Sequence, residues 1–126
     1  MKLMHLSDLH LGRRLYEYSL IDDQKYLLNR ILALVEQEQP RAVLIAGDVY
    51  DKSVPSAEAV ALLDEFLCRL SELVSDIFMI SGNHDSPERI AFGGRLMDAR
   101  GVHISPVYSG AIQPITLDGR FDFYLL

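Results

Sequence analysis

The chain has very little cysteine, no long apolar run and a minority of basic residues, and each shortage excludes a class of protein. Its single cysteine, Cys68, cannot form an intramolecular disulfide and suits a reducing compartment. We expect that side chain to be buried as a small apolar group. No stretch approaches the ~18 consecutive apolar residues of a membrane helix, and Asp8 interrupts the start before a secretory segment could form. We therefore expect a cytoplasmic protein without a membrane segment.

The charge balance limits how the chain can meet nucleic acid. It carries 12 Lys and Arg against 18 Asp and Glu, a formal net charge of -6. Proteins that hold nucleic acid by bulk positive charge need a dense basic face, so this composition argues against that mode. Metal ions held by carboxylates can still bring a phosphodiester to an acidic chain. Hydrophobic residues make up 49% of the 126 positions, enough for one compact domain.

Short apolar runs alternate with longer amphipathic segments, which is the pattern of βαβ units around a largely parallel sheet. We expect strands at residues 3–6, 42–46 and 77–80, and a further short strand at 102–104. The run at 42–46 is apolar throughout, as expected for a strand covered on both faces. The predicted fold class is α/β, a layered sheet with flanking helices.

Two long helices are predicted between these strands. The first spans residues 22–39 and ends at Pro40. Its apolar positions form one stripe that should be buried: Leu27, Leu28, Ile31, Leu34 and Val35. The second begins near Ser53 or Ser56, has Pro55 in its first turn and runs to about Val74. Its apolar residues fill an arc of roughly 160°, wider than one sheet contact needs.

The carboxyl-terminal third is predicted to be less regular. Another helix opens at Ser86-Pro87, is interrupted by two glycines at 93–94 and ends before residue 102. Residues 115–123 alternate around Asp118-Gly119, a strong hairpin signal. The apolar residues 121–126 follow with no polar terminus. We therefore expect residues 1–126 to be the amino-terminal part of one domain whose carboxyl-terminal part is absent.

Three clusters of metal-binding side chains follow the three main predicted strands. They read Asp8-Leu9-His10, Gly47-Asp48-Val49-Tyr50-Asp51 and Gly82-Asn83-His84-Asp85. Asp48 follows Asp8 by 40 residues and Asn83 follows Asp48 by 35, which leaves room each time for a crossover helix and a strand. Ligands of open α/β sheets bind at the carboxyl ends of the strands. Parallel strands would therefore bring the three clusters to one edge of the sheet.

The residue types in these clusters suit hard or borderline divalent cations, because they offer carboxylate, imidazole and amide groups without a thiolate. Asp8 and His10 stand two residues apart on a segment that we expect to be extended, so both would point to one side. Asp48 has two oxygens and could bridge two ions. Glycines before Asp48 and Asn83 would let the backbone turn sharply. Two ions ~3.5–4 Å apart would clamp a phosphate and activate a water.

In this order and wording the clusters resemble the calcineurin-like metallophosphoesterase superfamily, whose blocks read D-x-H, G-D-x-x-D and G-N-H-D. The residues around the three clusters, and the segment 55–60, resemble the bacterial DNA-repair exonucleases of that superfamily most. This resemblance extends over nearly the whole chain. The resemblance implies that Asp8, His10 and Asp48 hold a first ion. It also implies that Asp48 bridges to a second ion, which Asn83 helps to hold.

Further roles are implied by the same resemblance. His84 would stand over the scissile phosphate and protonate the leaving oxygen or stabilise its charge, and Asp51 would orient His84. The ions would be two Mn²⁺. The macromolecules bound would be DNA and a coiled-coil ATPase. A symmetric homodimer would form through the 56–74 helix and the helix after Ser86.

The sequence departs from the family pattern beyond the third cluster. The family completes its site with another histidine and a G-H-x-H block, and neither is present here. The remaining histidines, His5 and His103, are interpreted as structural. The first ion would lack one histidine and the second would lack two, so we expect an incomplete second site and an inactive chain on its own.

Each cluster taken alone has a plainer interpretation. Asp8 and His10 could be a capping acid and a surface imidazole, the glycine pairs could be turns, and Asp51 could be a cap. The joint pattern favours ligands. Arg13-Arg14 suits a phosphate contact or a solvated charge pair equally well.

Three functions fit the pattern. The first is a metal-dependent nuclease that hydrolyses phosphodiester bonds at DNA ends in repair and recombination. The alternative is a metallophosphatase or phosphodiesterase acting on a small molecule or a phosphoprotein, because the scaffold does not settle the substrate. The third is a non-catalytic dimerisation module.

Overall fold

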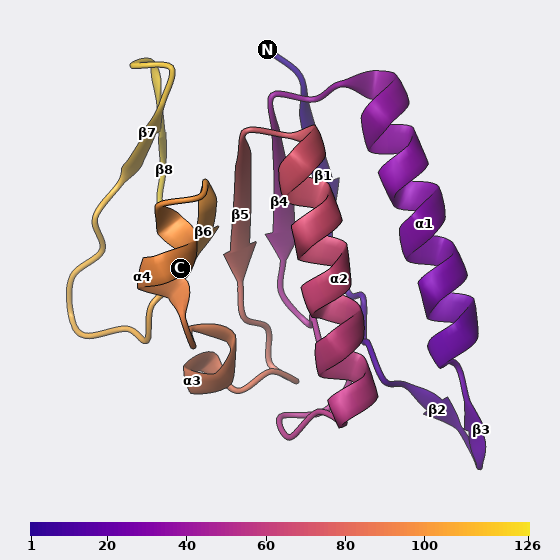
Figure 1. Cartoon of the computed structure of the whole chain (residues 1–126). Coiled ribbons are helices and arrows are strands. Elements are labelled where there is room, and N and C mark those ends of the chain that lie inside the picture. Colours follow the sequence, from indigo (N-terminus) through magenta and orange to yellow (C-terminus); the bar gives the residue numbers. More distant parts are fainter.

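A four-stranded parallel sheet forms the centre of the chain. The computed structural model describes residues 1–126. In sheet order the strands are β1 (Leu3–Leu6), β4 (Ala42–Ala46), β5 (Asp76–Ile80) and β6 (Val102–Ile104) (Figure 1). Each neighbouring pair is parallel, so the carboxyl ends of all four strands lie along one edge. The predicted strands and the α/β class are confirmed, with β5 starting one residue earlier than predicted.

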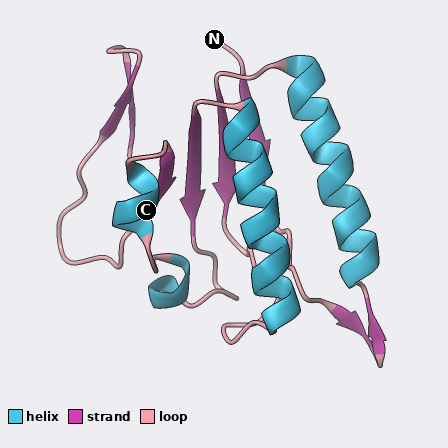
Figure 2. Cartoon of the chain, in the orientation of Figure 1, coloured by secondary structure: helices cyan, strands magenta, loops and turns pink.

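Helices α1 (Ile21–Glu38) and α2 (Ala57–Leu73) lie side by side over one face of the sheet (Figure 2). Each connects one strand to the next parallel strand, and right-handed crossovers that advance in one direction place their helices on the same face. Val43, Ile45, Ile77 and Met79 belong to the apolar core shared with these helices. None of the helices is both long and apolar enough to cross a membrane.

The buried stripe of α1 differs from the predicted one. Leu28, Leu32 and Val35 are buried, at a spacing of one helical face, whereas Leu27 and Leu34 are about half exposed. The predicted stripe was too wide because α2 and the sheet cover the face of α1 that carries Leu28, Leu32 and Val35, and leave the side with Leu27 and Leu34 open. The helix ends with Gln39 in a left-handed conformation just before Pro40, close to the predicted end.

Helix α2 begins after Ser56, whose hydroxyl accepts a hydrogen bond from the backbone of Ala59 at 3.2 Å. Pro55 therefore precedes the cap and does not lie in the first turn as predicted. The wide apolar arc faces both the sheet and α1, with Leu63 buried and Leu67 packed against the core. Cys68 is exposed, contrary to expectation, because it lies on the opposite side of the helix from the buried Ala59.

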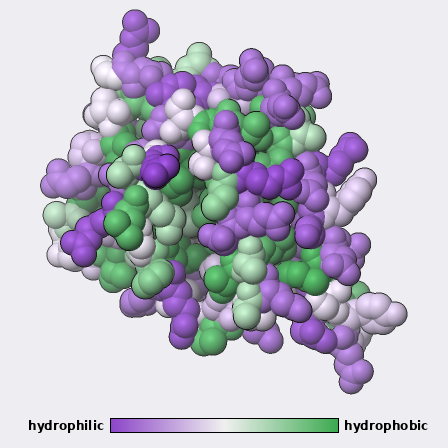
Figure 3. Space-filling model, in the orientation of Figure 1, coloured by the Kyte–Doolittle hydropathy of each residue, from purple (hydrophilic) through white to green (hydrophobic).

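The predicted interruption after Ser86 produces two short helices, α3 (Pro87–Ile90) and α4 (Gly94–Asp98). Ser86 caps α3, and Gly93 takes a left-handed conformation between the two. Phe92 and Leu96 are each 82% exposed in this α3–α4 segment. Figure 3 shows apolar residues among polar ones on the surface around the α3–α4 segment, whereas the surface over α1 is mostly polar.

Two hairpins complete the fold. The predicted one is β7 (Ile115–Leu117) with β8 (Phe121–Phe123), which turn at Asp118 and Gly119, both with positive φ. It covers the second face of the sheet, where the ring of Phe123 stacks on that of Phe78 at 4.5 Å. The other hairpin, β2 (Arg14–Leu15) with β3 (Tyr18–Ser19), was not predicted. It projects from the chain between β1 and α1.

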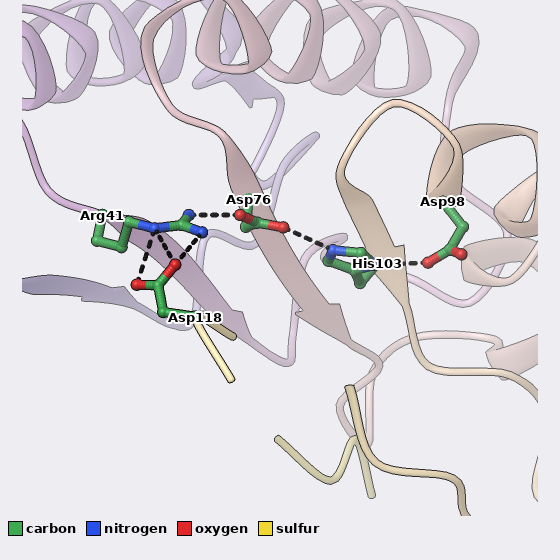
Figure 4. Close-up of polar contacts among 5 residues, drawn as sticks. All are labelled: Arg41, Asp76, Asp98, His103 and Asp118. Carbon is green, nitrogen blue, oxygen red and sulfur yellow. Dashed lines mark hydrogen bonds and ion pairs between the residues drawn. The ribbon is translucent and has the colours of Figure 1, made fainter. Parts of the chain in front are cut away.

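A charged network joins Arg41, which precedes β4, to Asp76 of β5 and His103 of β6 (Figure 4). Asp76 of β5 accepts hydrogen bonds from Arg41 and from Nε2 of His103, the latter at 2.9 Å. The other ring nitrogen of His103 lies 2.5 Å from Asp98, and Arg41 also pairs with Asp118 of the hairpin turn at 2.8 Å. Carboxylates thus face both ring nitrogens of His103.

This network changes the pKa of its members. Burial alone raises the pKa of the Asp76 carboxyl, but the hydrogen bonds and charges of Arg41 and His103 outweigh it and leave the pKa below its ordinary value. A carboxyl with a lowered pKa in the folded state stabilises the fold above its pKa in the unfolded chain, about 3.9. That stabilisation is lost as the pH falls through the folded pKa.

Replacing Asp76 by Asn should therefore destabilise the chain in a pH-dependent way. We expect Asp76→Asn to lower the free energy of unfolding at pH 7 by about 2 kcal/mol, because a charge-assisted acceptor for Arg41 is lost. Well below pH 4 the difference from wild type should shrink, because the native carboxyl is then protonated too. Urea unfolding of wild type and Asp76→Asn, at pH 7 and at a pH well below 4, measures the difference in the free energy of unfolding. Asp64→Asn, on the exposed side of α2, is the matched control, and an equal loss from Asp76→Asn at both pH values would contradict the account.

Candidate metal centre

Three loops leave the carboxyl ends of β1, β4 and β5 and meet beyond the sheet edge. We name them the first ligand loop (residues 7–12), the second (47–51) and the third (81–85). One ligand atom from each of Asp8, His10 and Asp48 lies within 4.8 Å of the other two. The predicted convergence of the first two clusters is thus confirmed. Carboxylate and imidazole groups gathered at this spacing could hold a divalent cation.

His10 lies between the two acids. Its Nε2 atom is 3.7 Å from Oδ1 of Asp8 and 3.7 Å from Oδ2 of Asp48. Two ligands of one ion, each bonded at about 2.1 Å, lie about 3 to 4 Å apart, so this separation suits a shared cation. The imidazole is mostly buried and Asp8 is exposed. The site is therefore open to solvent on the side of Asp8.

The backbone of these residues is strained. Asp8, His10 and Asp48 all have positive φ angles, of 55°, 45° and 47°. Side chains other than glycine rarely adopt this left-handed region, and such strain gathers at functional sites. The expectation that Asp8 and His10 lie on an extended segment is therefore wrong, although they do point toward one another. Their proximity comes from a curled loop.

Main-chain hydrogen bonds hold the first ligand loop to the second. The amide of His10 donates to the carbonyl of Asp48 at 2.9 Å, and the amide of Leu11 donates to that of Val49 at the same distance. These bonds continue the parallel pairing of β1 and β4 past the ends of the strands. Leu11 is buried in the core and anchors the loop. The two loops therefore form one unit.

The third ligand loop reaches Asp48 through its backbone and through Asn83. The amide nitrogen of His84 donates to Oδ1 of Asp48 at 3.0 Å. With its nitrogen toward Asp48, the Asn83 side chain donates to both carboxylate oxygens at 3.2 Å. If the Asn83 amide is turned so that its oxygen faces Asp48, only acceptor oxygens face the space between the two side chains. A bound cation requires such an arrangement. Asn83 is thus placed to serve with Asp48 as a metal ligand.

His84 lies at the rim of the site. Its ring is exposed and meets the ring of His10 edge to face, with centroids 5.1 Å apart. It borders an open cleft that is also lined by Asp51, Lys52 and Asn83. An exposed imidazole beside a candidate metal centre could exchange a proton with a molecule in that cleft.

Asp51 occupies a different place from the predicted one. Its Oδ1 atom lies 3.3 Å from Nδ1 of His10, and no hydrogen bond joins it to His84. The geometry to His10 is too bent for a hydrogen bond, so Nδ1 is a buried polar atom without a partner. A carboxylate behind a ligand histidine commonly fixes which ring nitrogen faces the metal. Asp51 is therefore placed behind His10, and its predicted contact with His84 is not found.

Asp85 is the one buried charged residue, and no role was predicted for it from the sequence. Its Oδ2 atom accepts hydrogen bonds from the amides of Gly82 at 2.8 Å and Val49 at 3.0 Å, and Oδ1 accepts from the amide of Tyr50 at 2.8 Å. The carboxylate thereby joins the second and third ligand loops. Burial, followed by the nearby charges of Asp85 and Asp64, raises the pKa of Tyr50 to about 12.

Gly82 permits the close contact of these loops. A Cβ atom at this position would lie 2.2 Å from both the backbone nitrogen and Oδ1 of Asp48. Only glycine leaves that space free. Gly47 serves the predicted purpose of a sharp turn, with φ at 80°.

The other predicted residues lie outside this centre. His5 and His103 belong to β1 and β6 and are not among the grouped ligands. Arg13 and Arg14 are exposed at the base of the β2–β3 hairpin, and Arg14 donates to the carbonyl of Glu17.

Comparison with known proteins agrees with this geometry. The sequence model of the calcineurin-like phosphoesterase family matches residues 1–123. A protein of Staphylococcus saprophyticus, named as the SbcD component of the nuclease SbcCD, is 38% identical over 127 aligned residues, which cover 100% of this chain and 34% of the relative. Its namesake in Staphylococcus epidermidis is 42% identical over 126 residues, 99% of this chain and 34% of the relative. The chain spans about a third of the length of these curated relatives.

Asp85→Asn tests the link between the loops. An amide can accept at only one of its two ends, so at least one buried N–H loses its partner, and the charge assistance is lost. We expect the free energy of unfolding to fall by about 2–3 kcal/mol. Asp122→Asn is the control, because Asp122 is exposed and accepts only through Oδ1, from Thr116. A loss below about 0.5 kcal/mol on urea unfolding would show that Asp85 does not hold the loops.

Proposed function

Because the chain belongs to the calcineurin-like phosphoesterase family, we propose that it forms the first part of the active site of a metal-dependent DNA nuclease. The observation that carries the proposal is that ligand atoms of Asp8, His10 and Asp48 lie within 4.8 Å of one another. Asn83 and His84 lie beside them. Two relatives, 38% and 42% identical to the chain, are named as components of a nuclease. An acidic chain can act on DNA in this way because the cations supply the positive charge.

We propose two divalent cations, Mn²⁺ in the cell, and assign the ligands residue by residue. Asp8, His10 and Asp48 would hold the first ion, and Asp48 and Asn83 the second. When bound, such ions supply Lewis-acid stabilisation and an activated water. Asp48 suits the bridging position because its two oxygens face different partners, Oδ2 toward His10 and Oδ1 toward the amide of His84.

His84 would act on the phosphodiester. Its exposed ring borders the open cleft, and its own amide holds Asp48. The residue therefore keeps a fixed position relative to the ligands while the imidazole protonates the leaving oxygen or stabilises its charge. Asp51 would act one step further back, by orienting His10 through the 3.3 Å contact to Nδ1.

The complete protein would act in DNA repair and recombination in the cytoplasm, with an SbcC-like coiled-coil ATPase as its partner. The relatives' name describes one component of the nuclease SbcCD, and the alignment covers 99–100% of this chain and 34% of each relative. We propose that the 126 residues alone have little activity. Only Asp48 and the neutral Asn83 are available to the second ion, too few to replace its water shell.

We also propose a symmetric homodimer through α2 and the α3–α4 segment. The core of the chain already accounts for most of the apolar arc of α2, since Leu63 and Leu67 pack inside. The large apolar residues of these elements that remain exposed are Val60, Leu73, Phe92 and Leu96. Exposed apolar residues that lie together on a surface mark contact sites. Sedimentation of the chain as a two-chain species would support the dimer, and a monomer at all micromolar concentrations would remove it.

In the complete protein, His84→Ala should remove nearly all cleavage of labelled duplex DNA and leave Mn²⁺ and DNA affinity nearly unchanged. The loss should be about 10²- to 10⁴-fold in kcat, because the imidazole acts in the transition state and is not a ligand. His5→Ala is the control, since His5 is an exposed histidine of β1 outside the ligand group.

Two outcomes would count against this assignment. A fall in metal affinity as large as the fall in activity, measured by calorimetry, would make His84 a ligand. If wild type leaves DNA intact but hydrolyses a chromogenic phosphomonoester or phosphodiester, the protein is a phosphatase or small-molecule phosphodiesterase instead.

A further inference from the structure

Gln24 is a polar residue at the end of the buried stripe of α1. It precedes Leu28 by four residues and Leu32 by eight, so it lies on the same helical face as these buried side chains. Its backbone amide donates to the carbonyl of Leu20 at 2.9 Å, which places it in the first turn of the helix. The side chain is half-buried and points to the first ligand loop rather than to solvent.

The Gln24 amide makes a two-sided contact with that loop. Its Nε2 atom donates to the carbonyl of His10 at 2.8 Å and, more weakly, to that of Leu9 at 3.4 Å. Its Oε1 atom accepts from the amide of Gly12 at 2.9 Å. One side chain thus satisfies both a carbonyl and an amide of the same short segment. A side-chain amide can do this because it carries a donor nitrogen and an acceptor oxygen on one uncharged group.

These bonds act on a backbone that would otherwise relax. His10 has a φ of 45°, a conformation that costs a non-glycine residue about 1–3 kcal/mol and persists only where its surroundings hold it. On the other side, Gly12 packs against α2, where a Cβ atom would lie 3.0 Å from that of Ala59. The segment from His10 to Gly12 therefore contacts both long helices, α1 through Gln24 and α2 through Ala59.

We propose that Gln24 is a positioning residue of the metal centre, which sets the orientation of His10 toward Asp8 and Asp48. This inference rests on the proposed function, because it takes His10 as a ligand. Gln24 does not itself touch the ligand atoms. By holding the carbonyl of His10, it keeps Nε2 of that ring 3.7 Å from each carboxylate. Without it, the left-handed backbone would relax and the imidazole would turn away from the acids.

Gln24→Glu is the sharpest substitution. The carboxylate has the same shape and still accepts from Gly12, but it cannot donate and places negative charge against the carbonyls of His10 and Leu9. Gln24→Met keeps the length and removes both contacts without adding charge. Gln37→Glu is the matched control, the same chemical change at an exposed position of the same helix.

The measurement, made on the complete protein, is the shift in the thermal unfolding midpoint between chelator and a fixed Mn²⁺ concentration. Calorimetry measures the Mn²⁺ affinity of the same variants. A metal that binds only the folded state raises this midpoint according to its affinity. We expect Mn²⁺ affinity to fall about tenfold or more in Gln24→Glu and Gln24→Met, as for other residues that orient ligands. Their Mn²⁺-induced shifts should be correspondingly smaller, while Gln37→Glu should match wild type.

A purely structural role would give a different result. Both Gln24 variants would then unfold earlier in chelator yet keep the wild-type affinity and the wild-type shift, which would overturn the inference. Failure of both variants to fold without metal would assign Gln24 to the fold alone and overturn it too. Absence of any Mn²⁺ effect in wild type would remove the proposed metal centre itself, and with it this inference.

Discussion

The buried carboxylate of Asp85 is the contact on which the geometry of the candidate centre depends. It receives three backbone N–H groups, one from the third ligand loop and two from the second. Each of these donors would be costly to leave unpaired in the interior. Because Gly82 has no side chain, the loops can come close enough for the amide of His84 to reach Asp48. The side chains of Asn83 and His84 are carried to the site by the same contact.

The first ligand loop is attached by other means. It pairs with the second loop through main-chain hydrogen bonds that continue the β1–β4 ladder, and α1 holds it from outside through Gln24. The three candidate ligands with positive φ are stable in this setting because many neighbouring groups restrain them. The parallel strands thus bring the three ligand loops to one edge of the sheet, and the buried polar contacts fix the positions of their side chains. Together they place the donor atoms in advance of any ion.

Much of this could be predicted from the sequence because the signals were local. The apolar runs at 42–46 and 77–80, the Asp118-Gly119 turn and the clusters at the strand ends each lie within a few residues. The roles of Asp85 and Gln24 could not be found in this way, since they bind backbone groups 36 and 14 residues distant. Their signals were a carboxylate in the third cluster and a polar residue in line with an apolar stripe. The exposure of Cys68 and Leu34 depended on how α1 and α2 pack together.

The proposal on which the others depend is that these loops form a metal centre at the sheet edge. Paramagnetic broadening of backbone amide resonances by Mn²⁺, with Mg²⁺ as the diamagnetic reference, tests it most directly. If the loops hold the ion, the strongest broadening falls on residues 8–10, on Asp48 and on residues 82–84. Strongest broadening at other acidic positions, such as Asp22 and Asp23 in the first turn of α1, or uniform weak broadening over the whole chain, would contradict it.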